Sequence, residues 1–381
     1  MDFSFSAEQQ RLRLAARAFF QREVTDELLG LLEQAHEEHD ADFHRRLAEQ
    51  AWIGLQWPKE SGGLGLSDVE SAILMEEAGY FFAPMTGYLV AVIAGSIILR
   101  AGTPEQIRRF LPDIASGRTL FCLGYTEPES GSDLASLSTR AVPAGAGWRL
   151  EGSKMFTSLA HEAQFALVAA RTNPDAPKRR GLTVFIVPLD QPGIGVGAVS
   201  TLGGFRTSVL SLDGVVVDQV DVLGEVDRGW ETIGAALDLE RTGASRLGFC
   251  RRLLDYLWDE LGGEICADTY LANVVGDLEL RLSASRLLSY RAAWLVGQGK
   301  LPSGEAAMAK VVSTELAQEI AETALRLVGE GALISRAGGG PLGGLVELAY
   351  RNAARFTVTA GTSEIQRTII ATRLLGLPRG P

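Results

Sequence analysis

The hydrophobic pattern of the first 119 residues is typical of successive amphipathic helices. Ser6 and Gln9 form a capping-box signature, and apolar residues then recur at near-helical spacing. A Thr-Pro pair at Thr103 marks another helix start. The spacing predicts helices over 8–32, 43–52, 67–77, 87–99 and 103–110.

The pattern changes near residue 120 to short runs that are β-branched or alternate between apolar and polar residues. Gly, Pro, Asn and Asp bound these runs, as expected for strands joined by turns. Strands are predicted over 148–152, 165–170, 182–188 and 209–217. Such a series of short strands favours a small antiparallel β domain, either a barrel or a sandwich, and we expect the barrel.

Helical spacing returns after Gly224 and continues to the end of the chain. Long helices are predicted over 230–260, 268–298, 304–328, 342–356 and 363–374. Long helices with short connections favour a four-helix bundle. The expected fold is therefore α+β but mainly α. It has an N-terminal helical domain (1–119), a central antiparallel β-barrel domain (120–226) and a C-terminal four-helix bundle (227–381).

Composition narrows the classes of partner. Of the 381 residues 46% are hydrophobic and 22% charged, and the net charge is −11, so the chain has no general basic field to attract nucleic acid or an anionic membrane. Three cysteines and four histidines show no disulfide framework or zinc-ligand spacing, and we expect no metal site.

Two stretches bear on location. The N-terminus lacks the basic and apolar regions of a secretory signal, so we expect a cytoplasmic protein. The uncharged stretch 80–99 approaches membrane-spanning length, but Pro84, Gly87 and Gly95 interrupt it. We interpret it as a buried helix.

Three polar segments are candidates for ligand binding. Segment 124–136 offers the hydroxyls of Thr126 and Ser132 in a turn, and segment 152–158 sets the aromatic Phe156 beside two hydroxyls. Segment 358–367 leads into the last helix, with Ser363 as the expected cap. Each also has a plain structural interpretation, as a polar turn, a core aromatic and simple helix capping.

Glu240 and Arg241 lie together in a predicted helix with apolar neighbours. Adjacent charges of this kind usually form a solvated pair. A carboxylate partly buried beside apolar surface instead has a raised pKa and can act as a general base. The residues alone leave both interpretations open.

Several motifs, taken in order, resemble the acyl-CoA dehydrogenase family along nearly the whole chain. They are Trp57-Pro-Lys-Glu-Ser-Gly-Gly-Leu-Gly, Gly102-Thr-Pro-Glu-Gln with Leu111-Pro and Ala115-Ser-Gly, Thr126-Glu-Pro with Gly131-Ser-Asp, and Gly361-Thr-Ser-Glu-Ile-Gln-Arg. The resemblance implies FAD held between the β domain and the bundle. It also implies α,β-dehydrogenation of an acyl-CoA thioester: a carboxylate removes the pro-R α-proton, the β-hydrogen leaves as hydride to flavin N5, and an electron-transfer flavoprotein takes the electrons.

The resemblance also implies roles for individual residues, by position. Contacts to FAD or to the pantetheine arm are expected from Tyr125, Thr126 and Ser132, an aromatic against the flavin from Phe156, a hydroxyl near N5 from Ser158, and further cofactor contacts from Thr362 and Glu364. Substrate contacts are expected from Ser132, Asp238 and Arg241.

The catalytic base is where the chain departs from most of the family. The usual Glu before the C-terminal Gly-Thr is replaced by Ala360, whose methyl group accepts no proton. A minority, including members resembling isovaleryl-CoA and long-chain dehydrogenases, carry the base on the helix after the β domain, directly before an Arg. Glu240 matches that place and is the expected base, while the Ala360 backbone N–H is expected to donate to the thioester carbonyl.

A second departure concerns the adenine end of FAD. The family's Arg-x-x-Phe-Gly and a later Gln fall on Trp258, Leu261, Gly262 and Thr269, and Glu330 interrupts the usual Gly-Gly-x-Gly loop. An acidic group beside a pyrophosphate is repulsive.

In this family those residues serve the FAD of a neighbouring subunit, so a paralogous chain is expected to supply them. That arrangement resembles the α2β2 heterotetramers of bacterial steroid side-chain degradation, and a bulky steroid-type or branched acyl-CoA is the expected substrate. Two alternatives stay open. One is a homotetramer for branched-chain or medium/long-chain acyl-CoA that holds the phosphates through Arg251 or Arg252. The other is a non-catalytic structural partner of a catalytic subunit.

Overall fold

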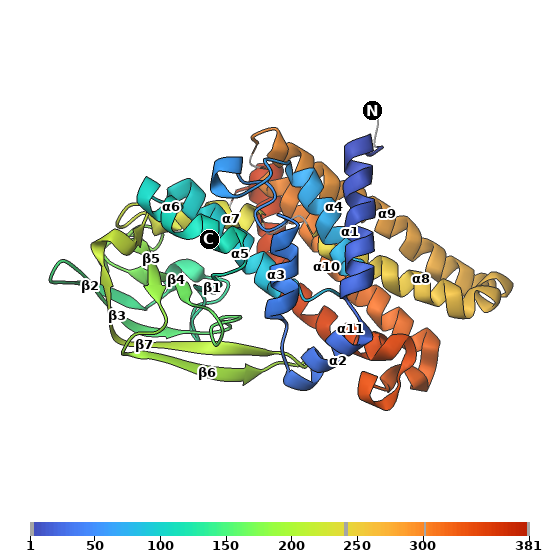
Figure 1. Cartoon of the computed structure of the whole chain (residues 1–381). Coiled ribbons are helices and arrows are strands. Elements are labelled where there is room, and N and C mark those ends of the chain that lie inside the picture. The colour runs from blue at the N-terminus through green and yellow to red at the C-terminus, as the bar shows by residue number, and fades with distance from the viewer. Residues whose placement is uncertain (1–3, 240–242, 301, 379–381) are drawn as a thin grey trace.

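The computed structural model describes residues 4–239, 243–300 and 302–378, and its N-terminal part is helical (Figure 1). The helices are α1 (Ala7–Glu23), α2 (Asp26–Ala35), α3 (Ala41–Glu49), α4 (Asp68–Tyr80), α5 (Thr86–Ala101) and α6 (Pro104–Ala115). The capping box of Ser6 and Gln9 forms as predicted. The helix expected over 8–32 is divided, because the Thr25 side chain accepts from the Leu28 N–H and starts α2.

The uncharged stretch 80–99 is divided between two helices. Tyr80 ends α4, residues 81–85 form a turn, and α5 begins at Thr86 with most of its residues buried in the core. Within the described ranges, no helix has the length and apolar character needed to cross a membrane.

The middle of the chain folds into one mixed β-sheet. Its strands are β1 (Phe121–Gly124), β2 (Arg140–Ala144), β3 (Gly147–Lys154), β4 (Phe165–Arg171), β5 (Leu182–Pro188), β6 (Ile194–Ser200), β7 (Arg206–Asp218) and β8 (Val222–Leu223). The order is β6-β7-β3-β2-β4-β5-β8, with β1 beside β4.

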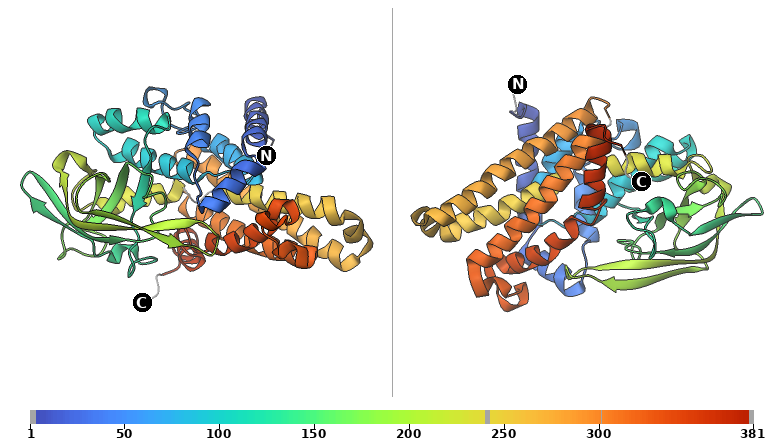
Figure 2. Two further views of the ribbon diagram at one scale, coloured as in Figure 1. Left: turned by 60° about the horizontal axis from the view of Figure 1, so that its bottom comes forward. Right: turned by 180° about the vertical axis from the view of Figure 1, so that it is seen from behind.

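This sheet corrects the expected antiparallel barrel. β1 runs parallel to β4 and β2 makes a short parallel contact with β4, so the sheet is mixed. Its two ends, β6 and β8, do not pair with each other, and the sheet stays open as it curves (Figure 2). Pairing direction depends on which distant strands meet, and alternating hydrophobicity within one strand does not encode that.

The C-terminal part is again helical. It contains α7 (Gly229–Leu239), α8 (Ala244–Ala267), α9 (Thr269–Gly297), α10 (Ser303–Val328), α11 (Leu345–Phe356) and α12 (Ser363–Ile369), which continues as a π-helical turn over Ile370–Leu374. The helix expected over 230–260 is interrupted at Gly243, whose left-handed φ of 74° precedes the start of α8. Helices α8, α9, α10 and α11 enclose their own apolar core.

Helix α4 joins the two helical parts through a close backbone contact with α8. A Cβ added to Gly79 would lie 1.9 Å from the Ser245 carbonyl oxygen, and one added to Gly248 would lie 1.9 Å from the Glu76 carbonyl oxygen. Only glycine allows helices to approach so closely. The contact fixes the N-terminal helices on the C-terminal ones; the domain limits 1–119, 120–226 and 227–381 remain a prediction.

Candidate functional site

The first predicted segment leaves the sheet at the end of β1. Tyr125 is buried, Thr126 is half-buried and Ser132 is exposed in the connection from β1 to β2. Two backbone hydrogen bonds between Glu127 and Ser130 close a tight turn in this connection. The segment is therefore an ordered turn that presents Ser132 outward.

The second segment follows β3 and touches the first. The Met155 N–H donates to the Thr126 carbonyl oxygen at 2.8 Å, which ties the two segments together. Phe156 then takes a left-handed backbone conformation with φ of 57°, and the residue is 58% exposed. Such a conformation is costly for an aromatic residue and is characteristic of functional sites. Phe156 is thus no core aromatic, and Ser158 lies half-buried two residues later.

The third segment is the turn before α12. Ala360 and Gly361 both have left-handed backbones, with φ of 55° and 89°, and Gln366 Nε2 donates to the Ala360 carbonyl oxygen at 2.9 Å. Thr362, and not the expected Ser363, caps the helix, because its Oγ1 accepts from the Ile365 N–H at 3.3 Å. The turn is held by this side-chain cap and by Gln366.

Two groups in this turn are candidates for ligand contact. Glu364 is exposed, and hydrogen bonds from its own backbone N–H and from Thr362 lower its pKa. The Ala360 N–H has no hydrogen-bond acceptor among the described residues. An amide without an internal acceptor is able to donate to a ligand.

The expected base lies just beyond the described residues of α7. Asp238 falls in the last turn of α7, whereas Glu240 and Arg241 lie outside the described residues. Helix α7 itself packs against α5 and β5, at the junction of the N-terminal helices and the sheet. The role of Glu240 therefore remains a prediction.

The three segments come from different parts of the fold. The first two lie together where β1 and β3 end, while α12 packs on α10, on the side of the helices that faces the sheet (Figure 2). The sheet meets α11 at the β6–β7 turn, where Arg351 donates to the Leu202 carbonyl oxygen at 2.9 Å.

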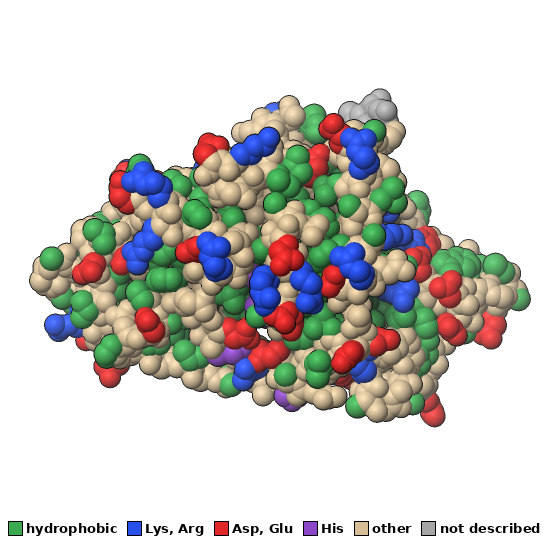
Figure 3. All heavy atoms as spheres, viewed as in Figure 1, with side chains coloured by type: hydrophobic (Ala, Val, Ile, Leu, Met, Phe, Trp, Pro, Cys, Tyr) green, Lys and Arg blue, Asp and Glu red, His purple; other side chains and the backbone are tan. Residues whose placement is uncertain are grey.

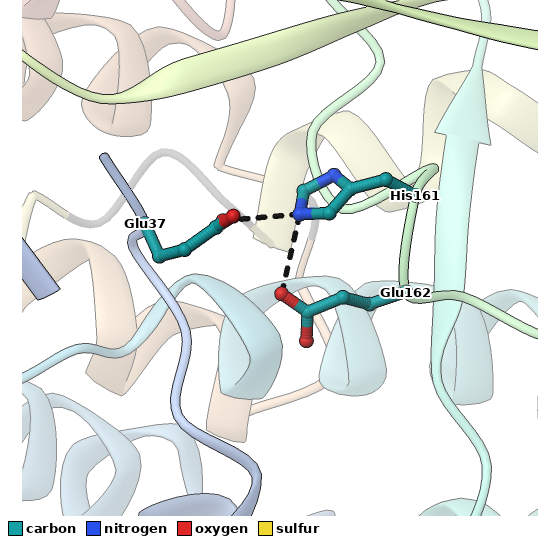
Figure 4. Close-up of side chains that lie close together, drawn as sticks. All are labelled: Glu37, His161 and Glu162. Atoms are coloured by element: carbon teal, nitrogen blue, oxygen red, sulfur yellow. Dashed lines mark hydrogen bonds and ion pairs between the residues drawn. The ribbon is translucent and has the colours of Figure 1, made fainter. Parts of the chain in front are cut away.

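A cluster of charged side chains that the sequence analysis missed lies just beyond Ser158. His161 Nε2 is 3.0 Å from Glu37 Oε2 and 3.2 Å from Glu162 Oε1 (Figure 4). Burial raises the pKa of Glu162. The three ligand-type atoms lie within 4.8 Å of one another, and Arg206 also pairs with the Glu37 carboxylate. We interpret the cluster as polar contacts that join the α2–α3 connection to the turn after Phe156.

The predicted adenine-end positions hold no cationic side chain. Trp258 Nε1 donates to Glu279 Oε1 at 2.9 Å, Leu261 and Gly262 lie in α8, and Thr269 is the first residue of α9. Glu330 is exposed in the turn after α10.

The two arginines considered as substitutes already have partners. Arg251 makes two hydrogen bonds of 2.6 Å to Glu279 and a 2.7 Å ion pair with Asp255. The Arg252 guanidinium lies 5.4 Å from the centre of the Tyr80 ring. Across the surface in Figure 3, basic side chains mostly lie next to acidic ones and do not collect into a field of one sign.

Comparison with known proteins identifies the class. The models of the acyl-CoA dehydrogenase N-terminal, middle and C-terminal domains match residues 6–118, 122–215 and 227–375. The chain belongs to the acyl-CoA dehydrogenase family. These are FAD-binding flavoproteins, oxidoreductases that act on a CH–CH bond.

The similarity to individual relatives extends over the whole chain. Acyl-CoA dehydrogenase FadE26 of Mycobacterium tuberculosis is 33% identical, over 100% of this chain and 99% of FadE26. Two solved structures, the Tcur3481–Tcur3483 steroid ACAD and the ChsE4–ChsE5 complex from Mycobacterium tuberculosis, are 31% and 32% identical. Each has a TM-score of 0.90 and covers 100% of both chains.

The residues at the flavin end fit FAD. An exposed aromatic ring beside partly exposed hydroxyls suits a planar heterocycle with polar edges. Thr157 Oγ1, between Phe156 and Ser158, is buried and has no hydrogen-bond partner among the described residues. A buried hydroxyl of this kind calls for a ligand or a water molecule as partner. At the adenine end, by contrast, the predicted positions offer the pyrophosphate no cation.

Proposed function

We propose that this chain catalyses the FAD-dependent α,β-dehydrogenation of an acyl-CoA thioester with Glu240 as the base. The observation that carries the proposal is the turn at Ala360, whose backbone N–H has no acceptor in the described part of the chain and whose methyl group stands where most of the family carries the base. A base is still required, and Glu240 directly follows the described end of α7. The family's minority arrangement gives Glu240 its role.

The chain's own groups would act on the two ends of the reacting bond. The Ala360 N–H donates a hydrogen bond to the thioester carbonyl, which stabilises the negative charge that develops as the α-proton leaves. Glu240 accepts that proton at its carboxylate. FAD, when bound, supplies the acceptor for the β-hydrogen.

Other residues would hold the two ligands. Contacts to FAD come from Tyr125, Thr126, Ser132, Phe156, Ser158, Thr362 and Glu364. Contacts to the CoA part come from Ser132, Asp238 and Arg241. Phe156 and Thr157 support the flavin contacts, since one presents an exposed ring and the other a buried hydroxyl without a partner among the described residues.

We further propose that a paralogous subunit completes the enzyme as an α2β2 heterotetramer. The adenine-end positions carry Trp258 in place of the family's Arg and Glu330 in place of a Gly. Arg251 is already paired with Glu279 and Asp255. The outer face of α9 offers a contact surface for a partner: Leu280, Leu287 and Trp294 recur at seven-residue spacing and are 69%, 50% and 53% exposed. A face of this kind is typical of helix packing between subunits.

The names of similar proteins support a substrate class and an electron acceptor. The Tcur3481–Tcur3483 protein is described as a steroid ACAD, and ChsE4–ChsE5 as a complex. The CarC subunit of Acetobacterium woodii, 31% identical over 97% of this chain and 99% of CarC, is named for a complex with Etf. We therefore propose a steroid-type or branched acyl-CoA as substrate and an electron-transfer flavoprotein as acceptor.

The test compares the chain purified alone with the chain purified together with a paralogous acyl-CoA dehydrogenase subunit from the same source. Flavin content, molecular mass and reduction of an artificial acceptor are measured with steroid-type, isovaleryl and octanoyl thioesters of CoA. The proposal expects full flavin loading and turnover only for the pair, and turnover lost in Glu240→Gln. Activity of the chain alone as a tetramer would instead establish the homotetramer. Full activity of a Glu240→Gln pair would make the chain a structural partner.

A further inference from the structure

Glu127 and Lys154 form a buried ion pair between the two segments assigned to the flavin. Lys154 Nζ lies 2.7 Å from Glu127 Oε1, and the two residues are 0% and 4% exposed. Lys154 is the last residue of β3, and Glu127 lies in the connection from β1 to β2. Their charges are therefore buried where segments 124–136 and 152–158 leave the sheet.

The Glu127 carboxylate also holds the far end of its own connection. Its Oε2 accepts from the Ser138 N–H at 2.6 Å and from Ser138 Oγ at 2.8 Å, and its Oε1 accepts from the Thr139 N–H at 2.8 Å. One carboxylate thus closes the loop from residue 127 to residue 139. Charge-assisted hydrogen bonds of this kind are among the strongest in proteins.

Lys154 extends the contact to the start of the loop. Its Nζ donates to the Tyr125 carbonyl oxygen at 3.3 Å, and the next residue, Met155, donates its N–H to the Thr126 carbonyl oxygen. Phe156 and Ser158 follow directly. The pair therefore fixes the position of the first segment relative to the second.

Burial and pairing act against each other on both charges. Burial lowers the pKa of Lys154 to about 8, opposed by the attraction of Glu127. Burial disfavours the charged form of Glu127, but the charge and hydrogen bond of Lys154, with those from Thr139 and Ser138, lower its pKa to about 2. Arg171, which donates to the Ala135 carbonyl oxygen, is a further cation near the carboxylate. Both members of the pair are ionised at neutral pH.

We propose that Glu127 and Lys154 are positioning residues that hold the two FAD-binding segments in register, so that Phe156 and Ser158 face the flavin together with Tyr125 and Thr126. This inference rests on the proposed function for the assignment of those segments to FAD. Both members of the pair are buried, so we assign them a positioning role and no direct contact with a ligand. Removing one member leaves the other charge buried and unpaired, which disrupts its surroundings more than removing both.

The test uses Glu127→Gln, Lys154→Met and the double variant, each assembled with the partner subunit. Lys178→Met is the matched control, because Lys178 makes an exposed 2.7 Å ion pair with Asp133 in the same loop. FAD affinity is measured by fluorescence quenching, the flavin environment by visible circular dichroism, and loop order by amide hydrogen exchange at Ser138 and Thr139.

We expect each single variant to raise the Kd for FAD at least tenfold, to change the visible circular dichroism of bound flavin and to speed exchange of the two amides at least tenfold. Amides of α8–α10 should keep their exchange rates. The double variant should weaken FAD less than the product of the two single effects, and Lys178→Met should stay within twofold of the parent.

Two results would overturn the inference. One is single variants with FAD affinity within twofold of the parent and an unchanged flavin spectrum. The other is multiplicative effects in the double variant, which would show that the two residues act independently. If the parent enzyme, assembled from both subunits, binds no FAD, the proposed function and the flavin role of the ion pair are both refuted. Amide exchange still shows in that case whether Glu127 holds the loop.

Discussion

Acidification to pH 5 should lower the free energy of unfolding, because His44 is buried in the N-terminal helical part. This residue is buried in α3, its ring centre lies 5.1 Å from that of His39, and burial lowers its pKa from 6.5 to about 3. A histidine whose pKa is lowered by folding binds a proton more readily in the unfolded chain. The contribution of His44 to the free energy of unfolding is therefore fully present above pH 6.5 and is lost as the pH falls from 6.5 towards 3.

The size of the effect follows from the two pKa values. Between pH 7 and pH 5 the unfolded chain takes up most of a proton at this site and the folded chain takes up almost none. Linkage gives a loss of about 2 kcal/mol from His44 alone. Burial also lowers the pKa of His39, which acts in the same direction.

The assay compares urea unfolding at pH 7 and pH 5 for the parent and for His44→Leu, followed by fluorescence of the buried Trp52 and Trp57. The parent should lose about 2 kcal/mol more than the variant over this range. Equal losses in the two proteins would refute the reasoning, because they would mean that His44 gains its proton as easily in the folded chain as in the unfolded one.

Two further changes test the packing and the assembly. Gly248→Ala should lower the free energy of unfolding in urea by about 3 kcal/mol, because its Cβ would lie 1.9 Å from the Glu76 carbonyl oxygen. The control Gly276→Ala, with open space around it in α9, should raise the free energy of unfolding by about 0.8 kcal/mol. Equal effects of the two substitutions would contradict the close α4–α8 contact. Leu287→Glu places a charge on the apolar face of α9 and should reduce the mass measured by light scattering for the assembled enzyme; an unchanged tetramer would exclude that face as the interface.

Much of the fold could be predicted from local patterns. The strand predicted over 182–188 matches β5, because this run is apolar except for Thr183 and the sheet buries it on both faces. Strand β6 could not be predicted, because it is an exposed edge strand that contains Gly195 and Gly197 and so lacks the apolar pattern of a buried strand. Helix breaks at Thr25 and Gly243 were also missed, although both residue types are common at helix starts.

The parts that could not be predicted depend on residues far apart in the chain. The pairing of β1 with β4 prevents a simple antiparallel barrel, and no pattern within either strand specifies it. Glu127 was visible only as part of a flavin motif, since its partner Lys154 is 27 residues away. The cluster of Glu37, His161 and Glu162 likewise forms only when the α2–α3 connection meets the sheet.

The central claim is that Glu240 removes the α-proton because Ala360 cannot. The most direct measurement is the turnover of the assembled enzyme carrying Glu240→Gln, with and without Ala360→Glu. The account predicts a fall in kcat of about 10³-fold for the single variant, as expected when a general base is lost. It predicts that the added Glu raises kcat at least tenfold above that of Glu240→Gln alone, since position 360 is, by the family resemblance, the usual place for the base. A Glu240→Gln enzyme with the parent's kcat would contradict the account.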